Sequence, residues 1–475
     1  MRKCLFSVAV VVALAAPAMG AEWYVDVNNT SGVEDGLTPQ TALTSIQTAV
    51  DLAEALDVII VAEGTYPENV VMPGVDIVLR STDPSDDAVI AATIIDGGQA
   101  GPVVTFEGSE TSVCVLSGFT LTNGMGTTGG GIEGNNTLAT IERNAITGNL
   151  AVEGKQANTG LGGGLYECHG PIRFNRIEEN TADQRGGGLN RCLGTIRRNR
   201  IINNAATHGG GLHGCNGVIL YNAILDNSAA GFGGGLRSCS GTIRNNVVAR
   251  NRADVQGGAF EGCDGAILNN TIVENTSPNG GAFAFCDAGL LKNCIMWDNV
   301  GGVFAGTPGV TADDAQYCCF PGGTDTNISQ SPRLRDTASN DFHLFASSPC
   351  VDAGGAIENL RRDYDGDRRG FDGAQDERGD GSDYDIGADE YVDELFFYRW
   401  VEEWTYVAGE FVDVTVRLQD FDGADSLTGL LGLTETVPDG WTYQGFVGEQ
   451  EPTVEAGVGD TIAFAWSVAE MELPY

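Results

Sequence analysis

Between residues 129 and 330 the chain repeats one pattern of glycine, aliphatic and asparagine positions. Glycine pairs begin at positions 129, 162, 186, 209, 233, 257 and 280, so all steps after the first are 23 or 24 residues long. A hydrophobic residue such as Leu165 or Leu212 follows each pair, and an aliphatic residue such as Ile177 lies between two recurring asparagines. Repetition at a short fixed period is the sequence signature of a solenoid, in which each unit packs against its neighbours.

The residue types of this unit favour strands and turns over helix, because Asn and Gly suit turns and β-branched residues suit strands. Three short strands in a unit of about 24 residues, each with one or two inward aliphatic side chains, predict one coil of a parallel β-helix. Coils stack about 4.8 Å apart, so equivalent residues form columns along the axis. We therefore predict an all-β solenoid with regular coils over residues 129–330 and irregular first coils over residues 21–128.

Two asparagine columns are predicted to hold the turns of the coils. A side-chain amide at a turn can donate to the next coil and accept from the previous one, which satisfies turn backbone groups. The second asparagine of each unit follows five residues after the first. The first column comprises Asn144, Asn175, Asn199, Asn222, Asn246, Asn270 and Asn293, and the second comprises Asn149, Asn180, Asn204, Asn227, Asn251 and Asn275.

A cysteine column follows the inward hydrophobic residues. Its members are Cys168, Cys192, Cys215, Cys239, Cys263 and Cys286. Free cysteine is among the most buried residue types, so stacked thiols in the core are one interpretation. Disulfides between neighbouring coils are a second, because the coil spacing falls within the Cα separation that a disulfide needs. Metal binding is a third, although a straight column does not readily form a tetrahedral thiolate site.

The position after each inward hydrophobic residue is predicted to form a surface column beside the glycine pairs. Its members are Tyr166, Asn190, His213, Arg237, Glu261 and Ala284. A long polar face suits a polysaccharide, so the first five are the candidate carbohydrate-binding residues. In an enzyme, His213, Arg237 and Glu261 could serve as base, charge clamp and acid. The alternative is an ordinary strand face that is polar because water covers it.

The first residues have the pattern of a secretory signal peptide. Arg2 and Lys3 precede an apolar run of about a dozen residues, and small residues follow at the predicted cleavage site. We predict that Met1 to Gly20 is removed and that the protein is secreted, periplasmic or at the cell surface. No other stretch approaches the ~20 apolar residues of a membrane-spanning helix, so we expect no membrane insertion of the mature chain.

The N-terminal end of the solenoid is predicted to carry a capping helix. Ile46, Ala49, Val50 and Ala53 follow Ser45 with helical spacing. An open coil exposes unpaired strand edges, and a helix placed over the first coil would shield them.

Acidic residues dominate the composition, with 65 Asp and Glu against 26 Lys and Arg and a net charge of −39. This charge argues against nucleic acid and against an anionic membrane surface as partners, because both are bound by clustered basic residues. Asp363, Asp365 and Asp367 have the spacing of the first ligands of a calcium loop, although Arg368 stands where an EF-hand has glycine. Calcium is the one cofactor predicted; the alternative is a solvated acidic turn.

The C-terminal part is predicted to differ from the coils. Residues 331–394 are expected to hold a closing coil and an acidic loop rich in Asp and Gly. Cys318 or Cys319, just before this segment, could pair with Cys350 within it. Residues 395–475 contain strand-like stretches separated by turns, which predict a small Ig-like β-sandwich. About 80 residues are fewer than the ~100 of such a domain, which favours an incomplete module.

Several segments resemble a known group of proteins. The stretch GLTPQTALTSIQTAVDLAEALDVIIVAEGTYPENV resembles the N-terminal cap of secreted right-handed parallel β-helix proteins of the pectin-lyase-like superfamily, and the GGGL coils are similar to their repeat. SSPCVDAG, DYDGDRR and DIGADEY resemble the closing segment of bacterial members. The resemblance covers roughly residues 21 to 392 and implies a right-handed helix.

The resemblance implies function less directly, because this fold carries lyases, hydrolases, epimerases and non-catalytic surface proteins. Lyases of the superfamily abstract a proton with Arg or Lys and often use calcium held by Asp, and the coils contain no compact Asp cluster. They also show no obvious carboxylate pair for a glycosidase. We therefore expect a non-catalytic exported protein that binds polysaccharide or a cell-surface glycan. The alternative is a carbohydrate-active enzyme, either a polysaccharide lyase or a glycoside hydrolase.

Overall fold

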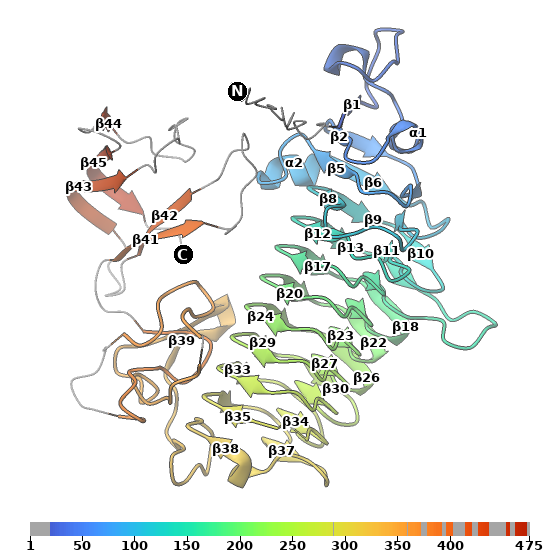
Figure 1. Ribbon diagram of the computed structural model, residues 1–475. Helices are drawn as coiled ribbons and strands as arrows, with labels where there is room; N and C mark the ends of the chain where they lie inside the picture. Colours follow the sequence, from blue (N-terminus) through green and yellow to red (C-terminus); the bar gives the residue numbers. More distant parts are fainter. Residues whose placement is uncertain are drawn as a thin grey trace, which may run out of the picture. The chain divides into compact units, whose positions relative to one another are not determined.

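The computed structural model describes residues 20–287, 289–358, 360–371 and 378–391, together with five strands between residues 396 and 472. The chain divides into two compact units, and the first extends to Glu390. This unit winds into a right-handed parallel β-solenoid of about 11 turns (Figure 1), so the predicted fold is confirmed. Within the described residues, no helix has the length and apolar character needed to cross a membrane.

Three parallel sheets form the walls of the solenoid. Each strand pairs in register with its equivalent in the next coil, as Ile172 pairs with Ile196. Sheet A comprises β1 (Glu22–Val25), β2 (Val58–Val61), β5 (Val78–Ser81), β8 (Val115–Ser117), β12 (Thr140–Glu142), β16 (Ile172–Arg173), β20 (Ile196–Arg197), β24 (Ile219–Leu220), β28 (Ile243–Arg244), β32 (Ile267–Leu268), β35 (Leu291–Lys292) and β38 (Ala315–Gln316). Sheet B comprises β3 (Gly64–Tyr66), β6 (Thr93–Asp96), β9 (Thr120–Thr122), β13 (Ala145–Thr147), β17 (Arg176–Glu178), β21 (Arg200–Ile202), β25 (Ala223–Leu225), β29 (Val247–Ala249), β33 (Thr271–Val273) and β36 (Ile295–Trp297). Sheet C comprises β4 (Val70–Val71), β7 (Val104–Thr105), β11 (Ile132–Glu133), β15 (Leu165–Tyr166), β19 (Leu189–Asn190), β23 (Leu212–His213), β27 (Leu236–Arg237), β31 (Phe260–Glu261), β34 (Phe283–Ala284) and β37 (Phe304–Ala305).

A fourth parallel sheet, sheet D, departs from the three strands per coil that the repeat predicts. In four successive coils the chain between the second asparagine and the glycine pair is four or five residues long, which is enough for an additional strand. After Asn149 this stretch is twelve residues long, and its first two residues form the strand. The strands of sheet D are at most five residues long, and their outward positions are polar or small. An alternation of hydrophobic and polar residues over so short a stretch is not recognisable in the sequence. Sheet D comprises β10 (Met125–Gly126), β14 (Leu150–Ala151), β18 (Thr181–Arg185), β22 (Ala205–His208), β26 (Ser228–Phe232) and β30 (Arg252–Ala253).

The glycine pairs turn the chain from sheet D into sheet C. Gly209 has a φ of +63°, in the left-handed region that side chains with a Cβ rarely adopt. At Gly210 a Cβ would lie 2.4 Å from the carbonyl oxygen of Ser228 in the next coil. One glycine is therefore required by conformation and the next by the close approach of two coils.

The core is one continuous set of buried aliphatic and aromatic columns inside the sheets. Leu189 and Leu212 are fully buried in one column, which continues as Phe260 and Phe283 in later coils. The two phenyl rings stack with their centroids 5.1 Å apart. Burial of each such side chain contributes about 1.5–3 kcal/mol. Because the interior is close-packed, neighbouring coils place side chains of similar size in one column.

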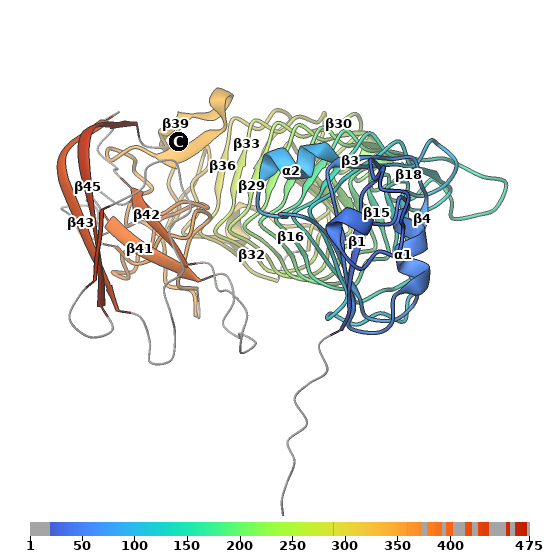
Figure 2. The ribbon, with the colours of Figure 1, turned by 90° about the horizontal axis from the view of Figure 1, so that it is seen from above.

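Two short helices lie at the N-terminal end. The α1 helix (Ile46–Leu52) packs against β1, β2 and β4, and Figure 2 shows it beside β1 and β4. Its first turn is capped by the Ser45 hydroxyl, which accepts from the Thr48 N–H, and by the carboxylate of Glu68. The α2 helix (Asp87–Ala92) packs against β6 and β9. Single turns of 3-10 helix are formed by η1 (Pro39–Thr41), η2 (Ala312–Asp314) and η3 (Thr337–Ser339).

Asparagine side chains form two buried ladders between the sheets. Asn222 shows the pattern: its backbone N–H and its Nδ2 both donate to Asn246 Oδ1, at 2.9 and 3.0 Å. The same Nδ2 donates to the Ile196 carbonyl oxygen in the previous coil. Each amide thus satisfies the turn backbone of two coils. The ladder at the boundary of sheets A and B comprises Asn144, Asn175, Asn199, Asn222, Asn246 and Asn270, and the one between sheets B and D comprises Asn149, Asn180, Asn204, Asn227, Asn251, Asn275 and Asn299.

The prediction that Asn293 continues the first ladder is wrong. Cys294 occupies that position, since the Asn270 amide faces its sulfur, and the Cys294 N–H donates to Cys318 Sγ at 3.4 Å. Asn293 instead lies one residue earlier, with a φ of +54°, and bonds outward. In the two coils before it, asparagine occupies both the ladder position and the position before it, as in Asn269 and Asn270. The sequence alone therefore does not show which of the two positions Asn293 occupies.

After the last coil, β39 (Leu334–Asp336) and β40 (Asp341–Leu344) form an antiparallel hairpin. The described residues of the closing segment (residues 350–390) then run without helix or strand along the side of the solenoid. The second unit begins at Tyr391, four residues before the predicted boundary. Its described strands are all antiparallel: β41 (Phe396–Val401) pairs with β42 (Val414–Gln419), and β45 (Thr461–Glu472) pairs with both β43 (Ser426–Thr436) and β44 (Thr453–Ala456). The Ig-like sandwich remains a prediction, and the predicted signal peptide up to residue 19 lies outside the described residues.

Candidate functional site

The column predicted to be a surface face is largely buried. Tyr166, Asn190 and Glu261 are 7%, 1% and 8% exposed, while His213 and Arg237 are half-buried. The expectation of an exposed column is therefore wrong. The cause is sheet D: the Phe232 side chain at the end of β26 lies against the Arg237 guanidinium, 5.0 Å from it.

Contacts within the column leave little chemistry for a substrate. The Arg237 Nε donates to Glu261 at 2.6 Å, so the proposed clamp and acid neutralise each other. Burial lowers the pKa of His213 to about 3, which keeps its imidazole neutral. Both polar atoms of the Asn190 amide are buried without a hydrogen-bond partner among the described residues. Because these side chains are packed and paired, truncation of Tyr166 or Arg237 is expected to lower stability.

The cysteine column lies in the core as free thiols. Cys168, Cys192, Cys215, Cys239, Cys263 and Cys286 are all fully buried. The backbone N–H of Cys239 donates to Cys263 Sγ at 3.5 Å, and that of Cys263 donates to Cys286 Sγ at 3.4 Å, so these two sulfurs accept hydrogen bonds from the previous coil. Burial raises the pKa of the Cys263 thiol well above its ordinary value, which makes the thiol unreactive. Cys319 and Cys350 are also buried and free, and their side chains interact; a disulfide between them stays a prediction.

A shallow open groove lies instead on the outer face of sheet D. Its middle is formed by small and hydroxylated side chains from β22 and β26, including Thr207 and Ser228. Charged side chains stand at the two ends: Asp183 at one, and the ion pair between Arg252 and Asp254 (2.9 Å) at the other. We call this surface the sheet D groove.

The two carboxylates of the sheet D groove are far apart. Asp183 lies within β18, and Asp254 directly follows β30, which is three coils away. At about 4.8 Å per coil this is roughly 14 Å, whereas glycosidases hold their two carboxylates about 5–9.5 Å apart. The groove can therefore offer hydrogen bonds along a polymer, but it does not hold an acid and base on the two sides of one glycosidic bond.

The three aspartates of the predicted calcium loop do not converge on one point. Asp363 is fully buried and its carboxylate accepts from three backbone N–H groups, those of Gly366, Asp367 and Glu390. Asp365 lies instead beside His343, with its Oδ2 3.2 Å from the imidazole Nε2. Calcium binding stays a prediction, because Asp363 is already bonded to backbone N–H groups and Asp365 is in contact with His343.

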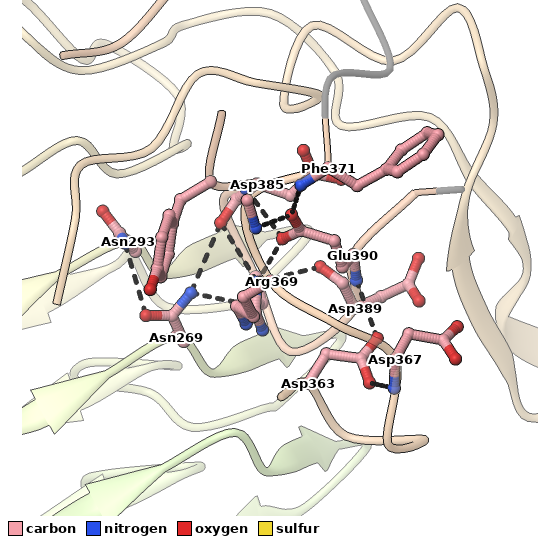
Figure 3. A network of polar contacts seen from close by, with 12 residues as sticks. Asn269, Asn293, Asp363, Asp367, Arg369, Phe371, Asp385, Asp389 and Glu390 are labelled. Carbon is pink, nitrogen blue, oxygen red and sulfur yellow. Dashed lines mark hydrogen bonds and ion pairs between the residues drawn. The ribbon is translucent and has the colours of Figure 1, made fainter. Parts of the chain in front are cut away.

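A buried ion pair organises the closing segment (Figure 3). Arg369 and Glu390 are both fully buried, and Arg369 Nη1 lies 3.2 Å from Glu390 Oε2. The other hydrogen bonds of the guanidinium go to carbonyl oxygens, at 2.8 Å for Gly387 and 2.7 Å for Ala388. Glu390 accepts in turn from the N–H groups of Gly370, Phe371 and Asp385. Burial raises the pKa of Glu390 to about 7, and the Arg369 charge opposes that rise.

Three asparagines attach the closing segment to the coils. Asn245, Asn269 and Asn293 occupy one left-handed position at the boundary of sheets A and B, with φ values of +51°, +48° and +54°. Their amides donate to carbonyl oxygens of Arg362, of Asp385 and Gly387, and of Gly355, respectively. In earlier coils this position holds Arg143, Phe174, Arg198 and Tyr221. The change from basic and aromatic residues to asparagine at this position is the sequence signal that would have shown where the closing segment contacts the coils.

Comparison with protein-family profiles gives no match, and no curated protein sequence matches the chain. Among solved structures, one titled "Crystal structure of pectate lyase Pel9A" is similar, with a TM-score of 0.47 and 14% sequence identity. The alignment covers 78% of this chain and 97% of that chain. A similarity at this level carries no inference about activity.

Proposed function

We propose that this protein is an exported, non-catalytic solenoid that binds a polysaccharide along the sheet D groove. The observation that carries the proposal is the groove itself, which crosses neighbouring coils and presents hydroxyl, alanine and charged groups in rows. A polymer of sugar rings is long, repetitive and rich in hydroxyl groups, so equivalent contacts can recur from coil to coil. The signal peptide pattern of the first 20 residues supports export.

The charge of the molecule favours neutral glycans over polyanions. The net charge is −39, and the groove contains two carboxylates against one guanidinium. A polyanion such as a pectate-like chain would be repelled at long range. We therefore expect neutral or sparsely charged glycans to be retained, with hydrogen bonds from Thr207, Ser228 and the charged groups at the ends of the groove.

A carbohydrate-active enzyme is the second candidate, and three features weigh against it. The groove carboxylates are separated by roughly 14 Å, which is too far for a hydrolase pair. In the buried column, Arg237 is paired with Glu261. Lysine, one of the bases that a lyase could use, occurs only three times in the chain.

The test is glycan binding by a variant in which the groove is filled. Thr207→Trp places a large side chain in the middle of the groove, from a position that is half-exposed. Thr147→Trp is the matched control, because Thr147 is a half-exposed threonine in a strand of sheet B. Affinity electrophoresis in neutral and acidic polysaccharides would measure retention, and reducing-end and unsaturated-product assays would measure turnover.

We expect the wild type and Thr147→Trp to be retained equally by a neutral polysaccharide and Thr207→Trp to bind at least about tenfold more weakly, a loss of about 1.4 kcal/mol. Equal retention of both variants would remove the groove from the proposal, and no retention of the wild type would contradict glycan binding. Product release that Asp183→Asn or Asp254→Asn abolishes would establish the enzyme instead.

A further inference from the structure

A histidine of the β39–β40 hairpin and two aspartates of the closing segment lie close together. His343 belongs to β40, while Asp365 and Asp389 belong to two different loops of the closing segment. One ligand atom from each lies within 4.8 Å of the others. Within the described residues this is the one group of three or more His, Cys, Asp or Glu side chains with metal-binding proximity.

The hydrogen bonding of Asp389 points to a ligand. This side chain is 6% exposed, and its Oδ2 accepts from the Leu344 backbone N–H at 2.8 Å. Its Oδ1 is buried without a hydrogen-bond partner among the described residues. A buried carboxylate oxygen normally has a partner, because leaving such an atom unsatisfied costs about 1–3 kcal/mol or more. A cation between Asp389 and its two neighbours would supply that partner.

The imidazole is oriented as a metal ligand would be. His343 Nδ1 lies 2.5 Å from Asp341 Oδ1, which fixes the ring and directs Nε2 towards Asp365. A carboxylate on the far nitrogen of a ligating histidine is the usual supporting contact of such sites. Nε2 and Asp365 Oδ2 are 3.2 Å apart. Two atoms that bind one tetrahedral zinc ion at about 2.0–2.1 Å are separated by roughly 3.3 Å, so this pair needs almost no movement.

We propose that His343, Asp365 and Asp389 bind one Zn²⁺ ion, which joins the β39–β40 hairpin to the closing segment. The donor set selects this class of metal, because imidazole suits zinc, whereas calcium takes six to eight oxygen ligands. Three carboxylates, those of Asp341, Asp365 and Asp389, surround the single imidazole, so a divalent cation also balances their charge. Three protein ligands leave a fourth position for water. This site is independent of glycan binding.

The experiment is zinc and cobalt titration of the untagged, chelator-treated full chain. Co²⁺ serves as the spectroscopic probe, because ligation by cysteine thiolates would add a charge-transfer band that histidine and carboxylate ligands do not give. The ligand variants are Asp389→Asn and His343→Gln, and Asp341→Asn tests the supporting contact. Asp383→Asn is the control, because Asp383 lies in the closing segment outside the cluster and has a φ of +57°, which Asn tolerates.

We expect the wild type and Asp383→Asn to bind one equivalent of Zn²⁺, without a thiolate band in the cobalt form, and to melt at a higher temperature with zinc. Asp341→Asn should bind about 10–100-fold more weakly, and both ligand variants more weakly still. If a ligand variant loses its far-UV circular dichroism, Asp365→Asn replaces it, because the Asp365 side chain is 22% exposed and Asn is close in size.

Three results would overturn the proposal: no zinc uptake by the wild type, equal uptake by the wild type and Asp389→Asn, or a cobalt spectrum dominated by thiolate. Calcium is the comparison ion, and displacement of cobalt by an equal concentration of Ca²⁺ would also contradict a zinc site.

Discussion

The coils and the closing segment both bury many polar groups, and they satisfy these groups with different chemistry. In the coils most of the buried polar side chains are neutral amides, and one rung such as Asn227 makes the same hydrogen bonds as the rung before it. In the closing segment they are charged, and each occurs once: Arg369 is paired with Glu390, and Asp363 accepts three backbone N–H groups. Desolvating an amide costs far less than desolvating a charge.

This difference affects how each region should respond to a mutation. A ladder rung lost in the coils leaves its neighbours bonded to the turns around them, because each amide also donates to a backbone carbonyl. The closing segment has no repeated element to replace a lost member. Its fold depends on a few side chains, which should make it both more sensitive to substitution and separable from the coils.

The largest effect is therefore expected at Arg369. Arg369→Met removes the charge that balances Glu390 and leaves several buried carbonyl oxygens without a donor. Breaking a buried ion pair by removing one partner costs about 3–5 kcal/mol. We expect the closing segment to unfold at a lower urea concentration than the coils, measured by hydrogen exchange of its amides.

Arg252→Ala is the control for that experiment. Arg252 pairs with Asp254, but their side chains are 69% and 49% exposed. Such surface pairs contribute about 0–1 kcal/mol. If Arg369→Met shifts unfolding no more than Arg252→Ala does, the charged network does not hold the closing segment and the contrast with the ladders fails.

The same difference explains what the sequence could predict. The coils repeat, so the spacing of Asn199, Asn222 and Asn246 alone indicates a ladder, and the fold follows from it. The closing network does not repeat: nothing in the letters pairs Arg369 with Glu390, which lie 21 residues apart in an acidic stretch. Exposure of the Tyr166 column was predicted wrongly for a related reason. It depends on sheet D, whose strands are too short and too polar to be recognised.

The ladder gives the next largest effect. Asn227→Leu removes the donor to the Ile201 carbonyl oxygen and the acceptor of the Asn204 amide, both buried. Leaving such groups unsatisfied costs about 1–3 kcal/mol. Thermal unfolding would measure the loss, with Asn216→Leu as an exposed control. Equal melting of both variants would mean that the amide ladder does not stabilise the coils.

Acid should destabilise the coils through His213 and not through the ladders, because amides do not titrate while this buried imidazole does. Burial lowers the pKa of His213 to about 3, against about 6.5 in an unfolded chain. Below pH 6.5 the unfolded chain therefore binds a proton that the folded coils do not. Stability from this residue is complete above pH 6.5 and falls towards pH 3, by about 1 kcal/mol per pH unit. His213→Gln should remove this pH dependence of the free energy of unfolding, measured by urea unfolding at pH 6 and at pH 5. If the wild type and the variant lose the same free energy between these two pH values, the pKa of His213 is not lowered in the folded protein.

The smallest effect is expected where the asparagines of the coils contact the closing segment. Asn245→Gly keeps the left-handed conformation at φ +51° and removes the amide that donates to the Arg362 carbonyl oxygen at 2.8 Å. Loss of one such hydrogen bond costs about 0.5–1.5 kcal/mol. Asn203→Gly is the matched control, because Asn203 has a φ of +55° in an exposed turn. Hydrogen exchange should show faster opening of the closing segment in Asn245→Gly than in Asn203→Gly, with the coils protected equally in both. If the coils lose protection together with the closing segment, the two regions unfold as one, and the difference between their polar networks has no separate effect on stability.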